Sequence, residues 1–231
     1  MDFDGKIAVV TGAAQGIGRA IAEALIAEHA DVVILDIDPD AIAKTAHEIG
    51  AYGAACDVTQ PKAIQEIVAD IKHDLGHIDI WISNAGVISA DPNHVASASD
   101  QIWQRAWDLH VMSHVWAARA LLPDMIARGS GYFVNTASAA GLLSQIGDAP
   151  YSATKAAAIN FAQSLAISHG DDGIQSSVVC PQYVASSMLG YDADDIIPDH
   201  PGLLTPEDVA RSVIDGIKEK HFLILPHPVV G

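Results

Sequence analysis

The sequence predicts an α/β fold, in which a doubly wound, seven-stranded parallel sheet is flanked by helices on both faces. Short runs rich in valine and isoleucine alternate along the chain with longer amphipathic or alanine-rich segments. This alternation is typical of βαβ units, whose parallel strands are buried on both faces. The chain has 231 residues and is 50% apolar, which suffices for one hydrophobic core without requiring a second domain. We therefore expect a single domain over residues 1–231.

The expected strands are apolar, β-branched runs at residues 6–11, 31–36, 51–56, 78–83, 131–136, 174–180 and 222–225. The segments between them have helical periodicity or a high alanine content, which predicts helices at residues 16–29, 38 or 39 to 49, 60–75, 100–107, 109–128, 151–168 and 206–219. Residues 186–205 form a long stretch with Gly, Pro and Asp, so we expect a flap there and not a core element.

The charge balance is strongly acidic, with 12 Lys and Arg against 29 Asp and Glu and a net charge of −17. Such a chain repels a phosphate backbone, so we expect no nucleic-acid partner. Cys56 and Cys180 lack metal-ligand spacing and are too few for a disulfide framework, which favours a reducing compartment. The acidic start lacks the features of a signal peptide, and no apolar run reaches about 18 residues. We expect a cytoplasmic protein with no membrane partner.

A glycine-rich segment, TGAAQGIG at residues 11–18, lies between the first expected strand and the first expected helix. It departs from the strict G-x-G-x-x-G pattern. Gly12 nevertheless permits a tight turn out of the strand, and Gly16 and Gly18 let backbone N–H groups approach a pyrophosphate at a helix N-terminus. This loop favours a Rossmann-type dinucleotide site, and the alternative is an ordinary turn between a strand and a helix.

Asp36 ends the second expected strand, about 20 residues further on, as dinucleotide sites require. A carboxylate there accepts hydrogen bonds from the adenosine ribose and repels a 2′-phosphate. No Lys or Arg stands at position 37 or at positions 13–15. Both observations favour NAD over NADP. The alternative is that Asp36 caps the next helix, for which the segment DIDPD offers several carboxylates.

The segment YSATK, residues 151–155, places Tyr151 and Lys155 four residues apart on one face of an expected helix. A free phenol has a pKa near 10, too high to exchange protons at neutral pH. An adjacent ammonium favours the phenolate and should lower the pKa of Tyr151 towards neutrality, where a general acid or base works best. The alternative is an exposed lysine beside a packed tyrosine.

Two further segments, CDVT at residues 56–59 and SNAG at residues 83–86, end the third and fourth expected strands. With TGAAQGIG and YSATK, in this order and at these intervals, they resemble the classical short-chain dehydrogenase/reductase family from about residue 5 to residue 226. The resemblance implies an NAD cofactor held by the residues that match the family's motifs, which are Gly12, Gln15, Gly16, Ile17, Gly18, Asp36, Asp57, Val58, Asn84, Gly86, Tyr151, Lys155, Pro181, Val184 and Ser186.

The resemblance assigns the chemistry to Ser138, Tyr151 and Lys155. It gives Tyr151 the proton exchange with the substrate oxygen, Ser138 a hydrogen bond to that oxygen, and Lys155 a bond to the nicotinamide ribose. His110 stands where the family has an asparagine that completes a catalytic tetrad through its main-chain carbonyl and a water. His110 and His114 are four residues apart, but no third ligand is evident nearby, so we expect no metal.

Some positions depart from the family's pattern around the nicotinamide and the substrate. Gln182 follows Pro181 where a glycine is usual, and Ser186 replaces a threonine that bonds the carboxamide, while the backbone of Val184 can still pair with that group. The expected substrate wall comprises Ile88, Ala139, Leu142, Leu143, Gln182, Tyr183 and the flap. These residues are mostly apolar and include no cation, which favours a small neutral alcohol or ketone as substrate.

The sequence therefore predicts an NAD-dependent oxidoreductase that interconverts a secondary alcohol and a ketone. One alternative is a catalytically impaired, NAD-binding or scaffolding member of the same family, because of His110. Another is a reductase of carrier-bound 3-oxoacyl chains, against which the acidic net charge argues. We also expect a homo-oligomer, a tetramer or a dimer, because the helices at 109–128 and 151–168 are apolar around much of their circumference.

Overall fold

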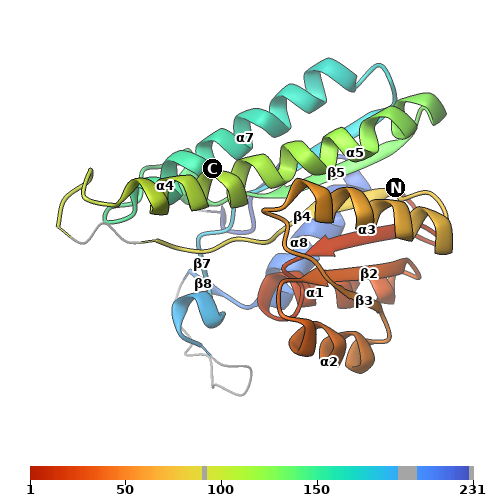
Figure 1. The fold of residues 1–231 in the computed structure, drawn as a ribbon, viewed down its shortest axis with the longest axis horizontal. Helices are drawn as coiled ribbons and strands as arrows, with labels where there is room; N and C mark the ends of the chain where they lie inside the picture. The colour runs from red at the N-terminus through yellow and green to blue at the C-terminus, as the bar shows by residue number, and fades with distance from the viewer. Residues whose placement is uncertain (90–92, 192–201, 229–231) are drawn as a thin grey trace.

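The computed structural model describes residues 1–89, 93–191 and 202–228 of the chain. Its main sheet has seven strands in the order β3-β2-β1-β4-β5-β6-β9, with every neighbouring pair parallel (Figure 1). These strands are β1 (Ile7–Thr11), β2 (Asp31–Asp36), β3 (Tyr52–Ala55), β4 (Ile80–Ser83), β5 (Gly131–Thr136), β6 (Ile174–Val179) and β9 (Leu223–Ile224). The predicted fold class is confirmed.

Helices connect the strands as the hydrophobic periodicity indicated. They are α1 (Gly16–Ala27), α2 (Pro39–Ile49), α3 (Pro61–Asp74), α4 (Asp100–Trp107), α5 (Ser113–Arg128), the short α6 (Ala139–Leu142), α7 (Ala149–His169) and α8 (Pro206–Glu219). Because β4 returns to pair with β1 while β2 and β3 lie on the other side of β1, the strand order reverses between β1 and β4. In open parallel sheets such a reversal marks the position of the ligand cleft.

Two hydrophobic layers enclose the sheet because successive strand residues point to opposite faces. Val10 and Ile34 pack with apolar residues of α1, α2 and α8. Val9 and Val33 pack on the other face with residues of α3, α5 and α7. Figure 1 shows α4, α5 and α7 above the sheet and α1 and α2 below it. This arrangement leaves the carboxyl ends of the strands free to form a site.

Helix α7 begins two residues earlier than the sequence predicted. Asp148 caps it by accepting a hydrogen bond from the Tyr151 backbone N–H at 3.1 Å, and Pro150 occupies the first turn. Proline fits there because the first N–H groups of a helix need no intrahelical partner. The cap fixes where α7 begins. It therefore fixes where Tyr151 and Lys155, which lie on this helix, stand relative to the end of β5.

The chain between residues 100 and 128 is continuous where two separate helices were expected. A π-helical turn, η1 (Asp108–Met112), joins α4 directly to α5, and the Ser113 backbone N–H bonds to the Asp108 carbonyl. Single π turns of this kind widen a helix locally and are frequent at functional sites. His110 lies in the middle of this turn, so the site position that departs from the family's pattern coincides with the distortion.

The flap expected at residues 186–205 falls partly outside the described residues, since 192–201 are not among them. On its near side the chain forms β7 (Tyr183–Val184) and the 3₁₀ helix η2 (Ser187–Leu189). On its far side β8 (Leu203–Leu204) pairs in parallel with β7. This two-stranded sheet brings the two sides of the predicted flap together beside the main sheet.

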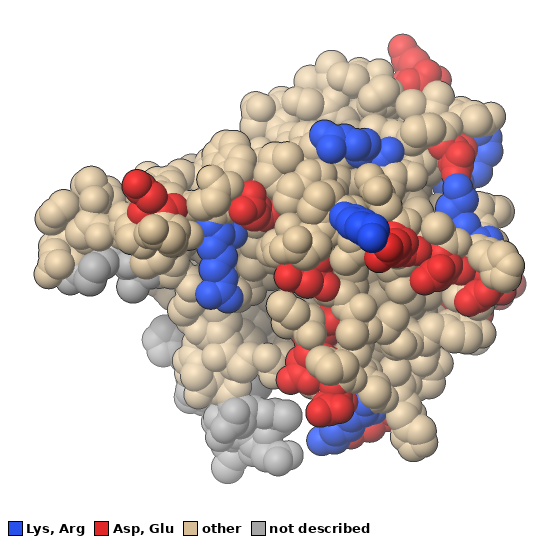
Figure 2. All heavy atoms as spheres, in the orientation of Figure 1, with Lys and Arg blue, Asp and Glu red and all other residues tan. Residues whose placement is uncertain are grey.

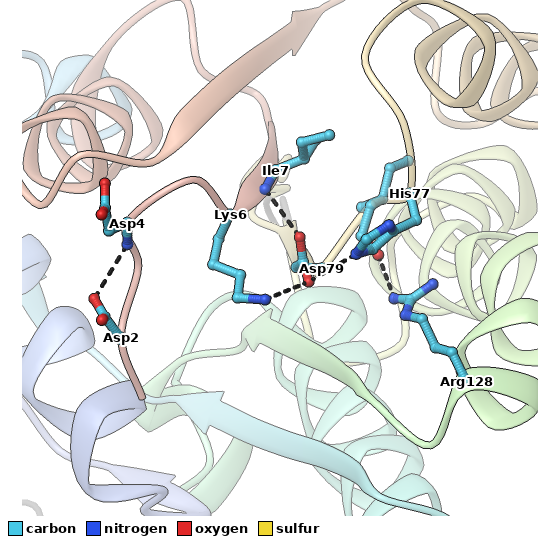
Figure 3. A network of polar contacts seen from close by, with 8 residues as sticks. Asp2, Asp4, Lys6, Ile7, His77, Asp79 and Arg128 are labelled. Carbon is cyan, nitrogen blue, oxygen red and sulfur yellow. Dashed lines mark hydrogen bonds and ion pairs between the residues drawn. The ribbon is translucent and has the colours of Figure 1, made fainter.

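The amino ends of the strands are tied together by the buried carboxylate of Asp79 (Figure 3). Its oxygens accept hydrogen bonds from the Ile7 backbone N–H and from Lys6 Nζ, both at 3.1 Å, and His77 Nε2 lies 3.4 Å from it. Arg128 donates nearby to the Ile78 carbonyl. This network lies at the edge of the sheet opposite the carboxyl ends, so it supports the fold and not the site.

Candidate active site

A single cleft of about 1060 Å³ lies at the carboxyl ends of the strands, across the point where the strand order reverses. Segments that follow all six strands from β1 to β6 contribute to its wall. It brings together Gly12, Gln15, Gly16, Ile17, Asp36, Asp57, Val58, Asn84, Gly86, Ser138, Tyr151, Lys155, Pro181, Val184 and Ser186. Among the predicted site residues, Gly18 and His110 do not line it.

The glycine-rich loop has the shape that a dinucleotide pyrophosphate needs. Gly12 has φ +62°, and a Cβ there would lie 2.7 Å from the Cα of Ala85, so no larger residue fits. A Cβ on Gly18 would lie 2.4 Å from the Gly12 carbonyl oxygen. Gly18 therefore acts beneath the loop, where it lets α1 pack closely, and not in the wall of the cleft.

The first turn of α1 is left open to an anion. Its N-cap residue, Gln15, makes no side-chain capping hydrogen bond, and the first turn carries no acidic residue. The backbone N–H groups of this turn are thus free of a side-chain cap, and the helix dipole adds positive potential. The residues present therefore fit a bound phosphate group at this end of the cleft.

Asp36 lines the cleft with one carboxylate oxygen on the Ala14 backbone N–H at 3.1 Å. The N-cap of α2 is Asp38, whose side chain accepts from two backbone N–H groups. The alternative that Asp36 is the helix cap is therefore wrong. Ile37, the next residue, is 67% exposed and uncharged, so it offers no counter-charge to a phosphate.

Asn84 holds the ends of β1 and β4 in place. Its side-chain amide donates to the carbonyls of Thr11 and Gly12 at 3.0 and 3.2 Å. The Thr11 hydroxyl in turn accepts the backbone N–H groups of Asn84 and Ala85. These bonds fix the floor of the cleft between the glycine loop and the segment that begins at Gly86.

Ser138, Tyr151 and Lys155 converge on the wall of the cleft nearest β5, and all three are at least nine-tenths buried. Ser138 Oγ accepts from the Ala140 backbone N–H at 3.1 Å and lies 3.4 Å from the Pro181 carbonyl oxygen. Lys155 Nζ donates to the Thr136 carbonyl at 2.7 Å and lies 5.6 Å from the centroid of the Tyr151 ring. The proposed serine, tyrosine and lysine therefore form one constellation.

The pKa of Tyr151 moves in the direction opposite to that expected from its spacing to Lys155. In the chain alone, burial raises the pKa of the phenol, and hydrogen bonding to Ser138 lowers it by less. The expected net lowering is therefore wrong for the chain by itself. The reason is that burial penalises the phenolate, and the nearby Asp148 carboxylate adds to the rise.

Burial acts on Lys155 as well and lowers its pKa from 10.5 to about 8. At pH 7 the Lys155 side chain therefore remains protonated, but its pKa lies only slightly above that pH. The pKa of the nearby Cys180 thiol is raised by burial to about 11, so that side chain is uncharged at neutral pH. Among the described residues, Lys155 is consequently a positively charged group next to the Tyr151 ring, and Asp148 is a negatively charged one at its backbone.

His110 is fully buried behind this constellation, and both nitrogens of its ring are engaged. Nε2 accepts the Val87 backbone N–H at 3.1 Å, so Nδ1 carries the proton and donates to Thr154 Oγ1 at 2.9 Å. The Thr154 hydroxyl then donates to the Pro150 carbonyl at 2.7 Å. Burial, with the positive charge of Lys155, lowers the pKa of His110 to about 2. The imidazole is thus neutral and its tautomer is set by its partners.

The ring of His110 also contacts Tyr151 edge-on, with the ring centroids 5.5 Å apart. His114 is also buried, and burial lowers its pKa to about 3. No group of three or more His, Cys, Asp or Glu side chains suited to a metal ion occurs among the described residues. His110 therefore packs against Tyr151 as a neutral ring, and His114 is a second buried, neutral histidine.

Asp148 is a site residue that the sequence reasoning missed. One oxygen caps α7 at Tyr151, and the other accepts the Ser89 backbone N–H at 2.7 Å. It therefore ties the segment after β4 to the helix that carries Tyr151. The signal was present as an aspartate directly before the helical run, with a proline in the first turn.

Most of the residues predicted for the substrate wall line the cleft. Ile88, Ala139, Leu143, Gln182 and Tyr183 line the cleft. Leu142 does not line it and is 41% exposed. Arg105, on α4, also lines the cleft, so the expectation of a wall without a cation is wrong. Sequence reasoning did not include this residue, because Arg105 matches none of the motif positions and its place in the cleft depends on how α4 packs.

Comparison with known proteins agrees with this geometry. The profile of the short chain dehydrogenase family matches residues 6–196. Meso-2,3-butanediol dehydrogenase of Serratia marcescens is 35% identical over 191 residues, which are 81% of this chain and 75% of that protein. Among the described residues, no helix is long and apolar enough to cross a membrane.

Two solved structures share the fold over nearly the whole chain. A short-chain dehydrogenase/reductase from Burkholderia phymatum in complex with NAD has a TM-score of 0.89 at 27% identity, covering 100% of this chain and 92% of its own. L-sorbose reductase from Gluconobacter frateurii, complexed with NADPH and L-sorbose, has a TM-score of 0.86 at 27% identity, covering 97% of both chains. The chain therefore belongs to the classical short-chain dehydrogenase/reductase family of oxidoreductases.

Proposed function

We propose that the chain is an NAD-dependent oxidoreductase that interconverts a secondary alcohol and a ketone. The observation that carries this proposal is that one cleft holds both the glycine loop with Asp36 and the buried set of Ser138, Tyr151 and Lys155. A protein that only bound a dinucleotide would not need a serine, a phenol and an ammonium at the far end of its cleft. Their presence argues against the scaffolding alternative.

When bound, the cofactor accepts or donates a hydride at its nicotinamide ring. The Tyr151 hydroxyl takes the proton of the carbinol oxygen in oxidation and returns it to the carbonyl oxygen in reduction. Ser138 Oγ turns from its long, 3.4 Å contact with Pro181 to donate a hydrogen bond to the same oxygen. In oxidation the alcohol thus loses a hydride from carbon and a proton from oxygen, and a ketone remains.

Lys155 supplies the charge that makes this proton exchange feasible at neutral pH. The chain alone holds the pKa of Tyr151 above its ordinary value, so positive charge must offset that rise during turnover. Lys155 contributes such charge and is positioned to hold the nicotinamide ribose. The imidazole of His110 has no free position for a relay, because both of its nitrogens are already bonded. We therefore propose that the relay uses the His110 main-chain carbonyl.

Asp36 should make the enzyme prefer NAD to NADP by at least about tenfold in kcat/KM, roughly 1.4 kcal/mol. Its carboxylate faces the cleft next to the uncharged Ile37 and would repel a 2′-phosphate. Asp36→Ala should narrow the preference by restoring use of NADP. Asp38→Ala is the matched control, because it removes a neighbouring carboxylate that caps α2. A wild-type kcat/KM that favours NADP would contradict the assignment.

The alternative of a reductase for carrier-bound acyl chains has less support. Carrier proteins are acidic, so their docking needs a continuous basic surface, whereas this chain has a net charge of −17. On the face drawn in Figure 2, Lys and Arg side chains are separated by Asp, Glu and uncharged residues. The apolar side chains of Ile88, Leu143 and Tyr183 in the cleft instead suit a small neutral alcohol or ketone, although Arg105 also lines the cleft.

Turnover tests the proposal directly. Purified protein is incubated with NAD and a panel of neutral secondary alcohols, and NADH formation is followed by absorbance. Turnover by the wild type that Ser138→Ala abolishes supports the assignment. Ser144→Ala is the control, because Ser144 lines the same cleft but is not part of the buried set. Tight NADH binding without turnover of any alcohol or ketone would favour the scaffolding alternative.

We propose a homo-oligomer, a tetramer or a dimer, with α5 and α7 at the contact. The outer face of α7 presents Ala153, Ala156 and the 76%-exposed Ile167 to solvent, and small or apolar side chains let a second helix approach closely. Light scattering at micromolar concentration should give a multiple of the 24.2 kDa chain mass. Ile167→Glu should lower that mass, whereas Tyr52→Glu, at the opposite edge of the sheet, should not. A monomeric wild type would refute this proposal.

We propose the cytoplasm as the location of the protein. Cys56 and Cys180 are buried and are not joined in a disulfide, which suits a reducing compartment.

A further inference from the structure

The buried His227 bonds to backbone groups of two other segments, residues 182–183 in the wall of the cleft and Gly202 next to β8. Its side chain is 1% exposed. Nδ1 accepts the Gln182 backbone N–H at 3.1 Å, while Nε2 lies 3.0 Å from the Tyr183 carbonyl and 3.1 Å from the Gly202 carbonyl. An amide N–H can only donate and a carbonyl can only accept. The ring is therefore neutral, with its proton on Nε2.

The backbone held by His227 belongs to the wall of the cleft. Gln182 and Tyr183 line the cleft, and Tyr183–Val184 forms β7, which pairs with β8 next to Gly202. Directly before Gln182, the Pro181 carbonyl accepts the Ala139 backbone N–H at 2.8 Å and contacts Ser138 Oγ. A shift of this segment would therefore move the Val184 backbone and disturb the surroundings of Ser138.

We propose that His227 is a positioning residue of the active site. Its neutral imidazole holds residues 182–184 so that the Val184 backbone meets the nicotinamide carboxamide and Gln182 and Tyr183 form one substrate wall. The proposal rests on the proposed function, because that function places the nicotinamide beside Val184. Few side chains can replace the imidazole, since the site requires an acceptor on one side and a donor on the other within a space closed to water.

The test separates the nicotinamide half of the cofactor from the adenosine half. His227→Phe keeps a ring of similar size and removes both hydrogen bonds. It should raise the Kd for the reduced dinucleotide, NADH or NADPH, whichever the wild type binds more tightly, by about tenfold. The Kd for the matching ADP-ribose, which lacks nicotinamide, should change less than about twofold. Isothermal titration calorimetry measures both, and no alcohol substrate is needed.

His227→Gln is the rescue variant, because its amide carries both an acceptor and a donor, and it should recover at least part of the lost affinity. His221→Phe is the matched control, since that side chain is 60% exposed and lies six residues earlier on the same segment. Neither Kd should change in this control. An equal rise of both Kd values in His227→Phe would show a merely structural role and overturn the proposal, and so would no rise in either.

If His227→Phe does not fold, amide hydrogen exchange of the wild-type protein still tests the proposal. The Gln182 amide donates to a buried nitrogen and should exchange slowly, and more slowly than in His227→Gln. Free exchange of that amide in the wild type would overturn the proposal. Failure of the proposed function would give a different set of results from failure of the His227 proposal. No alcohol or ketone would be turned over, while the selective loss of dinucleotide affinity in His227→Phe would remain.

Discussion

Tyr151→Phe should lower kcat/KM for alcohol oxidation by at least about two orders of magnitude, while the Kd for NADH stays within about threefold. The change removes the hydroxyl that exchanges the substrate proton and keeps the ring that packs against His110 and Lys155. Steady-state kinetics and a binding titration measure the two quantities. A variant that retains more than about a tenth of the wild-type kcat/KM would show that another group carries the proton.

Tyr52→Phe is the matched control, because this tyrosine lies on β3 outside the cleft and is 54% exposed. Its kcat should stay within about threefold of the wild type, roughly 0.7 kcal/mol of barrier.

His110→Asn tests the relay in the same assays. With the imidazole already neutral, because its pKa is lowered to about 2, this variant should keep activity within about tenfold, roughly 1.4 kcal/mol. The pH–rate profile should also keep its shape. A lost or shifted limb of that profile would instead show that the imidazole carries part of the acid–base chemistry.

Lys155→Met should make the protein more stable at pH 7 and less active. Burial lowers the pKa of Lys155 from 10.5 to about 8, and that difference corresponds to about 3 kcal/mol of cost for the buried charge. Loss of the hydrogen bond to the Thr136 carbonyl offsets about 1 kcal/mol. We therefore expect the free energy of unfolding to rise by about 2 kcal/mol in urea titrations. Activity should fall at least about 100-fold, because the ribose contact and the charge beneath Tyr151 are both lost.

The pH dependence of the stability gained by Lys155→Met follows from proton binding to the lysine in the wild type. Between pH 8 and 10.5 the unfolded wild type holds the lysine proton and the folded wild type does not, so wild-type stability rises with pH. The advantage of Lys155→Met should therefore be complete below pH 8 and fade as pH rises towards 10.5. Lys44→Met is the control, because that lysine side chain is 78% exposed. A Lys155→Met variant that is less stable than the wild type at pH 7 would contradict this account.

The sequence by itself determined the fold and most of the cleft. Strand positions followed from apolar runs, because a parallel sheet is buried on both faces and admits few polar residues. The helices followed from periodicity, and the glycine loop and Asp36 from turn chemistry and spacing, which are local properties of the chain. Residues that end parallel strands meet at one edge of the sheet, so the motif residues could be expected to share one cleft.

Only the tertiary structure decided the electrostatics and the supporting contacts. The direction of the Tyr151 pKa shift depends on how deeply the phenol is buried and on the nearby Asp148 carboxylate, which spacing along a helix cannot report. The neutral state of His110 likewise depends on Val87 and Thr154, whose bonds to it span 23 and 44 residues of sequence.

His227 meets Gln182 across 45 residues. For Tyr151, His110 and His227 alike, the interacting groups are brought together, and water is excluded around them, only after the elements have packed. A pKa shift or a buried hydrogen bond requires both conditions, so these properties belong to the folded protein and not to any segment of its sequence.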